Sequence, residues 1–134
     1  MGNTVRVIAR LDIKGPNLIK GIQFEGNRCL GTADGFGKLY YEEGADELVY
    51  QDAVASLYRR NSLHEIIRTT AETAAIPLTV VGGMRSTEDI REVLRAGADK
   101  VAINTAGIAN PQLFRDAAKI FGSQCIVASI EVYR

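Results

Sequence analysis

The chain has 134 residues, of which 46% are hydrophobic and 24% are charged, and its 16 basic side chains balance 16 acidic ones. This composition predicts one globular domain with a substantial core and excludes a disordered chain, while the zero net charge gives no general attraction to nucleic acid or an anionic membrane. No apolar run approaches the roughly 20 residues of a membrane span, and the first residues lack a signal-peptide core, so we expect a cytoplasmic protein.

Short β-rich segments alternate with longer helical ones along the chain. The predicted strands are 5–12, 48–52, 77–81, 100–104 and 125–132. The predicted helices are 33–43, 62–74, 86–96 and 110–122. Such alternation implies right-handed crossovers and a parallel sheet, so the predicted fold class is α/β, with residues 1–134 forming a single domain.

Residue types typical of helix ends mark the boundaries of these helices. Ser86, with Asp89 three residues later, predicts a capping box, and Asn110 followed by Pro111 predicts an N-cap and a first helical residue. Three glycines occupy positions expected for C-terminal caps: Gly44, Gly97 and Gly122.

A short repeat connects two of these boundaries. The segments 42–52 and 95–105 both contain Gly-Ala-Asp followed by a strand, at a separation of 53 residues. A spacing near two βα units favours a barrel built from duplicated quarters. The alternative is coincidence, because Gly-Ala-Asp is a common turn between a helix and a strand.

Polar residues end all five predicted strands. They are Asp12, Asp52, Gly82-Gly83, Asn104-Thr105 and Glu131. The carboxyl ends of parallel strands meet at one edge of a sheet, where α/β proteins place their sites, so we expect a shared polar rim. The alternative is that each residue only caps or turns its own loop.

Within this rim, residues 79–90 form the predicted anion site. Gly82 and Gly83 let the backbone approach a ligand closely, and Ser86 begins a helix whose free N–H groups favour phosphate. Asn104 and Thr105 end the next strand and extend the same site. The alternative is a pair of ordinary tight turns.

Two carboxylates are the candidates for acid–base chemistry. Asp12 and Glu131 end the first and fifth strands, which face each other across the mouth of an eight-stranded barrel and can divide general acid and base work. Lys20, in a loop beyond the Gly15-Pro16 turn, can fold back over that mouth; its alternative is a solvated loop lysine. Cys29 and Cys125 are too few and too far apart for a disulfide framework, and we expect no metal and no cofactor.

The chain resembles the N-terminal half of the cyclase subunit of imidazole glycerol phosphate synthase, and more closely the cyclase-like paralogues of surface-polysaccharide synthesis. The matching segments are "VIARLDIKGPNLIKGIQFEG", "GADELVYQDAVAS", "IPLTVVGGMRSTEDIREVLRAGADKVAINTA" and "FGSQCIVASIEV". This resemblance implies a (β/α)8 TIM barrel, supplied with ammonia by a glutamine amidotransferase subunit. It also implies a metal-free cyclisation and lyase reaction on a phosphorylated aminoimidazole ribonucleotide, in histidine biosynthesis or a polysaccharide-linked branch.

The resemblance also assigns roles by position. Asp12 matches the first catalytic aspartate and Lys20 matches the lysine of the loop that closes over the mouth. Asp52 matches the aspartate that ends the second strand. The positions on the phosphate-binding group are Gly83, Asn104 and Thr105.

Three departures from the family pattern bear on activity. Val81 replaces the first of three family glycines, and Glu131 replaces the second catalytic aspartate with a side chain one methylene longer. The chain also holds only five of eight strands, so we expect a fragment of a longer gene, a soluble rearranged half-barrel, or a half-barrel that self-associates. We favour the homodimer or higher oligomer, and a catalytically inactive phosphate-binding half-barrel remains the alternative function.

Overall fold

The computed structural model describes residues 5–14, 17–22, 26–52, 60–104 and 109–130. Its strands are β1 (Ile8–Lys14), β2 (Asn17–Ile22), β3 (Gly26–Thr32), β4 (Glu47–Asp52), β5 (Leu78–Val81), β6 (Lys100–Ile103) and β7 (Ile126–Ala128). Its α-helices are α1 (Ala33–Glu42), α2 (Arg60–Thr73), α3 (Thr87–Ala96) and α5 (Gln112–Phe121). None of the described helices is long and apolar enough to cross a bilayer.

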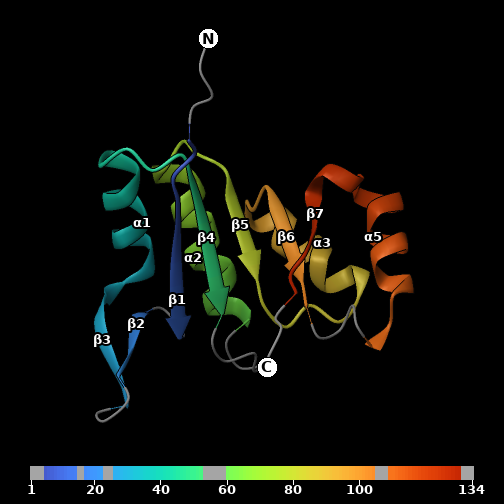
Figure 1. Ribbon diagram of the computed structural model, residues 1–134, viewed down its shortest axis with the longest axis horizontal. Coiled ribbons are helices and arrows are strands. Elements are labelled where there is room, and N and C mark those ends of the chain that lie inside the picture. Colours follow the sequence, from blue (N-terminus) through green and yellow to red (C-terminus); the bar gives the residue numbers. More distant parts are fainter. Residues whose placement is uncertain (1–4, 15–16, 23–25, 53–59, 105–108, 131–134) are drawn as a thin grey trace.

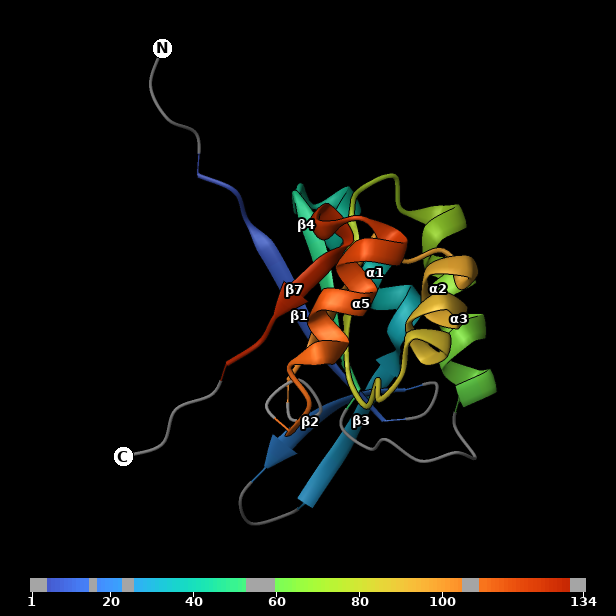
Figure 2. The same cartoon turned by 90° about the vertical axis from the view of Figure 1, so that its right-hand side faces the viewer.

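The strands form one sheet in the order β3-β2-β1-β4-β5-β6-β7. Five of them, β1, β4, β5, β6 and β7, run parallel to their neighbours, and the four helices lie on one face of this parallel part (Figure 1). In the side view of Figure 2 the opposite face carries no helix of the described chain. The predicted α/β half of a barrel is therefore confirmed.

An antiparallel pair of strands, β2 and β3, extends the sheet beyond β1. It replaces the predicted loop around Lys20, so the loop interpretation of this residue is wrong. β2 folds back on the end of β1, where Ile13 pairs with Leu18 and Lys14 pairs with Asn17. These ladder bonds, rather than a local sequence pattern, make the segment extended.

The core lies between the sheet and the helices. Leu11, Leu48, Val80 and Val101 contribute one buried side chain from each of four adjacent strands, and Ile67 of α2 packs among them. On β1 the burial alternates, because Leu11 is buried while its neighbours Arg10 and Asp12 are exposed. β1 is therefore buried on one face only, since helices cover only that face.

The two Gly-Ala-Asp segments form the same motif. The amides of Gly44 and Ala45 bond the carbonyls three and five residues back, and Gly97 and Ala98 repeat this pattern, which is a Schellman cap. All four bonds stop a helix and turn the chain toward the next strand. Both segments therefore form the same helix-to-strand turn, which fits the duplication and the coincidence alike.

The aspartate of each segment then forms two hydrogen bonds with the backbone at the start of a neighbouring strand. Asp46 accepts a bond from the Val7 amide at 2.7 Å and returns one to the Val7 carbonyl at 2.8 Å. Asp99 makes the same two bonds with Leu78, at 2.8 and 2.9 Å. The repeat therefore sets the starts of two strands that lie two places apart in the parallel sheet.

Candidate active site

Asp12 lies on the uncovered face of the sheet, two residues before the end of β1. The prediction that the strand stops at Asp12 is wrong, because pairing continues through Ile13, opposite Asp52, to Lys14. Its backbone neighbour on β4 is Gln51. The side chain of Asp12 is 51% exposed, so it is open to a ligand on this face.

Sequence reasoning missed two residues beside Asp12. Arg10 lies one strand repeat earlier on the same face, and its Nε donates to Asp12 Oδ1 at 3.2 Å, with Nη2 also 3.2 Å from that oxygen. Gln51, half-buried, lies opposite Asp12 on β4. The two-residue spacing in "RLD" was the signal for Arg10, because alternate residues of a strand share a face.

Gly82 and Gly83 follow β5 at the same edge of the sheet. Gly82 is buried, Gly83 is exposed, and the carbonyl of Gly82 accepts a bond from the Met84 amide at 2.7 Å in a tight turn. The exposed Gly83 leaves its backbone open to close approach by a ligand.

The predicted capping box at the start of α3 is confirmed. Ser86 Oγ accepts the Asp89 amide at 3.2 Å, and Asp89 Oδ2 accepts the Arg85 amide at 3.0 Å. Glu88 and Asp89 place two carboxylates in the first turn, where they complement the helix dipole themselves and repel an added anion. The helix therefore contributes less to an anion site than the sequence suggested.

The structure describes the side chain of only one of the other predicted site residues. Asn104 is half-buried directly after β6, at the edge that also holds Gly83. The structure describes only the backbone of Lys20, in β2, and of Asp52, at the end of β4. Two further predicted residues lie outside the described residues: Thr105 and Glu131.

The last strand and helix differ from prediction in their limits. β7 spans only Ile126–Ala128, although the Ser129 amide still bonds the Ile103 carbonyl at 2.9 Å. Pro111 has helical backbone angles, φ −59° and ψ −21°, but it occupies the N-cap position of α5 and makes no side-chain cap bond, so the predicted N-cap at Asn110 is wrong. Cys125 is a free thiol, as expected.

A second charged group lies at the opposite end of the uncovered face. Glu47, at the start of β4, forms ion pairs with Arg6 and, at 4.0 Å, with Lys100 at the start of β6. Glu47 is only 13% exposed, so this group is shielded more than the Arg10–Asp12 pair. The predicted rim did not include it, because that rim comprises only residues at the carboxyl ends of strands.

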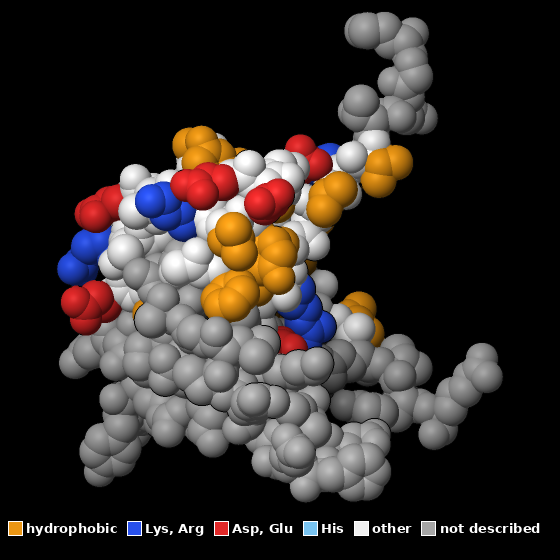
Figure 3. Space-filling model, turned by 90° about the vertical axis from the view of Figure 1, so that its left-hand side faces the viewer, with side chains coloured by type: hydrophobic (Ala, Val, Ile, Leu, Met, Phe, Trp, Pro, Cys, Tyr) orange, Lys and Arg blue, Asp and Glu red, His pale blue; other side chains and the backbone are white. Residues whose placement is uncertain are grey.

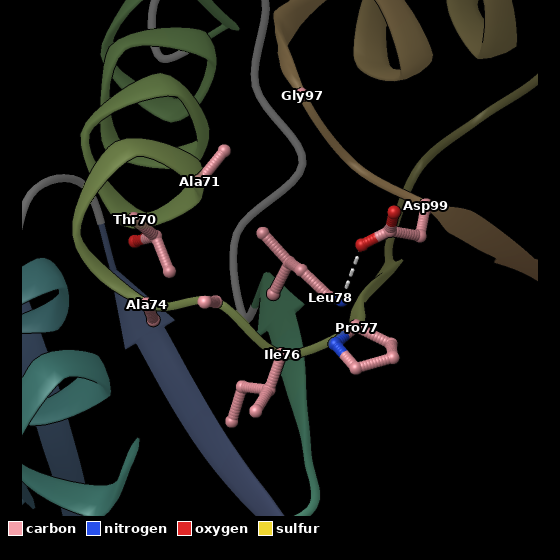
Figure 4. A pocket seen from close by; sticks show the side chains of 9 residues that line it. Thr70, Ala71, Ala74, Ile76, Pro77, Leu78, Gly97 and Asp99 are labelled. Carbon is pink, nitrogen blue, oxygen red and sulfur yellow. Dashed lines mark hydrogen bonds between the residues drawn. The ribbon is translucent and has the colours of Figure 1, made fainter. Parts of the chain in front are cut away.

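A pocket of about 370 Å³ also lies at that amino-terminal end, on the helix side (Figure 4). Asp99 lines it while it holds the Leu78 amide, as the dashed bond shows. The other lining residues are mainly small or apolar: Thr70, Ala71, Ala74, Ala75, Ile76, Pro77 and Gly97. The pocket therefore lies away from Asp12 and Gly83, which are at the carboxyl edge.

Residues 6–134 match the protein family described as "Histidine biosynthesis protein". The chain belongs to the histidine biosynthesis protein family. Its relatives include proteins named imidazole glycerol phosphate synthase subunit HisF, which is consistent with the resemblance seen in the sequence. The paralogues of surface-polysaccharide synthesis are not distinguished by these matches.

Three relatives in the histidine biosynthesis protein family illustrate the identity and the length of the match. The HisF subunit of Legionella pneumophila is 60% identical over 132 residues, which are 98% of this chain and 62% of the relative. Those of Myxococcus xanthus and Methanocaldococcus jannaschii are 49% and 48% identical over 131 residues, covering 52% and 48% of their lengths. The chain thus spans about half the length of most relatives it matches.

Proposed function

We propose that the chain supplies the N-terminal half of an imidazole glycerol phosphate synthase cyclase, acting on a phosphorylated aminoimidazole ribonucleotide with ammonia. The observation that carries this proposal is the joint placement of Asp12, Gly83 and Asn104 at one edge of a sheet whose sequence matches HisF subunits throughout. A carboxylate at the same sheet edge as an exposed glycine backbone and an amide suits a phosphorylated substrate that needs proton transfer.

In this proposal Asp12 exchanges a proton with the substrate, and Glu131 serves as its counterpart from the fifth strand. Gly82, Gly83, Asn104 and Thr105 bind one phosphate through backbone and amide groups, while Lys20 and Asp52 line the mouth. The family resemblance implies a reaction without a metal, in which carboxylates carry out the proton steps.

The proposed ammonia source is a glutamine amidotransferase subunit at the amino-terminal end of the strands. The Arg6–Glu47–Lys100 group and the nearby pocket give that end charged and apolar features. Because the resembled family passes ammonia through the barrel to the far mouth, this end is the expected entrance. A pull-down with the amidotransferase subunit tests this partner, with Glu47→Gln as the variant.

A second candidate function is a phosphate-binding half-barrel without turnover that self-associates. The observation that favours it is exposed apolar surface on the uncovered sheet face and at both ends of the helix layer. Ile8 on β1 is 50% exposed and Ile120 on α5 is 52% exposed, while Leu39 and Tyr40 lie exposed on α1. Figure 3 shows hydrophobic side chains gathered beside acidic ones on the α1 side. Such surface is typical of an interface.

Two measurements decide between these functions. The solution mass is measured first, and turnover of the aminoimidazole substrate with ammonium salt is then measured for the native chain and Asp12→Asn. Ammonia-dependent turnover that is lost in Asp12→Asn supports the cyclase. A dimer that binds inorganic phosphate without any turnover supports the second function, and a monomer active only with a separate C-terminal half excludes the self-sufficient dimer.

A further inference from the structure

Arg10 and Asp12 form an ion pair on β1, in which the guanidinium contacts one particular oxygen of the carboxylate. Leu11 and Ile13 point into the core, so the alternate residues Arg10 and Asp12 share the uncovered face. Two guanidinium nitrogens, Nε and Nη2, each lie 3.2 Å from the same carboxylate oxygen, Oδ1. No other described side chain bonds to Asp12, so Oδ2 has no hydrogen-bond partner among the described residues.

The neighbouring strands offer Arg10 no competing carboxylate. Its backbone partner on β4 is Val49, and the same row continues through Thr79 on β5 to Lys100 on β6. Glu47, the nearest acidic residue at the starts of these strands, is already paired with two cations. The described surroundings of Arg10 therefore direct its guanidinium toward Asp12.

We infer that Arg10 is a positioning residue for Asp12: its Nε–H donates to Oδ1, with Nη2 at ion-pair distance from the same oxygen, and this contact orients the carboxylate for proton exchange with the substrate. This inference rests on the proposed function of Asp12. The guanidinium suits the task because it is planar, stays charged at every working pH and presents its donors in a fixed fork. A lysine carries the same charge without that fork, so its contact with Oδ1 is less directional.

The strength of the pair sets the size of the expected effect. The side chains of Arg10 and Asp12 are 61% and 51% exposed, and ion pairs this exposed contribute little free energy. Without substrate, the pair therefore favours the paired Asp12 rotamer over the others by only about two- to fivefold. Substrate that covers the mouth removes water and strengthens the pair. Catalysis then depends on it more strongly, because small displacements of a reacting group lower rates by about 10- to 100-fold.

The orientation is tested first without any activity. Side-chain rotamers of Asp12 are measured by NMR from its Hα–Hβ couplings in the native chain, Arg10→Met and Arg10→Lys. We expect one dominant rotamer in the native chain, averaging in Arg10→Met and an intermediate result in Arg10→Lys. Arg68→Met, an exposed arginine on α2, is the matched control and should leave the couplings unchanged. Identical couplings in all four proteins would overturn the inference.

Turnover gives the second test. In Arg10→Met, kcat should fall about tenfold while KM changes by less than about twofold, because the pair orients a reacting group rather than binding substrate. Guanidinium ion added to Arg10→Ala should restore part of the rate, which a merely structural role does not predict. Native turnover with an unchanged rate in Arg10→Met contradicts the inference. Absence of turnover by the native chain, both alone and with a separate C-terminal half, contradicts the proposed function instead, and the NMR result then decides the inference alone.

Discussion

Replacing Gly37 by alanine should destabilise the fold, because the new methyl group would collide with the buried hydroxyl of Tyr50. A Cβ at position 37 falls well inside contact distance of that oxygen and lies 3.4 Å from Leu48 Cδ1 and 3.5 Å from Thr70 Cγ2. The hydroxyl cannot retreat freely, since it lies 2.6 Å from Thr70 Oγ1, which donates to the Ile66 carbonyl at 2.8 Å. Gly37 in α1 thus makes room for a hydrogen-bonded tyrosine of β4.

The change in the free energy of unfolding on Gly37→Ala is the difference between two opposing effects. Alanine improves the helix by up to about 1 kcal/mol, whereas an extra methyl group in a packed core costs about 1–3 kcal/mol. We therefore expect Gly37→Ala to lower the free energy of unfolding by about 1–2 kcal/mol. Tyr50→Phe alone should cost about 1 kcal/mol for the lost hydrogen bond, but it removes the colliding oxygen. In that background Gly37→Ala should be neutral or stabilising.

Urea unfolding followed by circular dichroism measures all four proteins of this cycle at one protein concentration. Gly35→Ala is the control, because Gly35 lies exposed in the same helix and should gain only helix propensity. Equal destabilisation by Gly37→Ala with and without the Tyr50 hydroxyl would refute the reasoning, as would a stabilised single variant.

Four further substitutions test the role of Asp12, the hydrogen bonds that hold two strand starts, and the cap of α3. Asp12→Asn keeps the side-chain size but removes the proton acceptor, so ammonia-dependent turnover should fall about 10²- to 10⁴-fold with an unchanged urea midpoint; an unchanged rate would contradict the role of Asp12. Asp99→Ala should lower the free energy of unfolding by about 1–2 kcal/mol in urea, and Asp46→Ala by less, because its bond is exposed; the reverse order would contradict the burial argument. Ser86→Ala should cost about 1 kcal/mol by the same assay, with Ser86→Thr as the hydroxyl-bearing control; equal loss in both variants would show that the cap bond is not responsible.

The sequence alone determined the features that depend on near neighbours. Alternation of strand and helix patterns predicted the α/β class, and the capping box at Ser86 and the glycine at 97 predicted helix ends that the structure contains. These signals are reliable because a cap bonds residues three to five positions apart. The polar rim was likewise predictable in part, since strand direction alone brings Gly83 and Asn104 to one edge.

Tertiary structure decided what depends on distant parts of the chain. The strands β2 and β3 exist because they pair with each other and β2 pairs with β1, whereas the sequence had predicted a loop at Lys20. The exposure of Asp12 follows from helices that cover only one face, and Glu47 meets Arg6 and Lys100 only through strand order. Pairing partners and coverage are set by the whole fold, so no local pattern specifies them. The sequence placed a carboxylate near the end of the first strand, and the fold gave it an open face and an arginine partner.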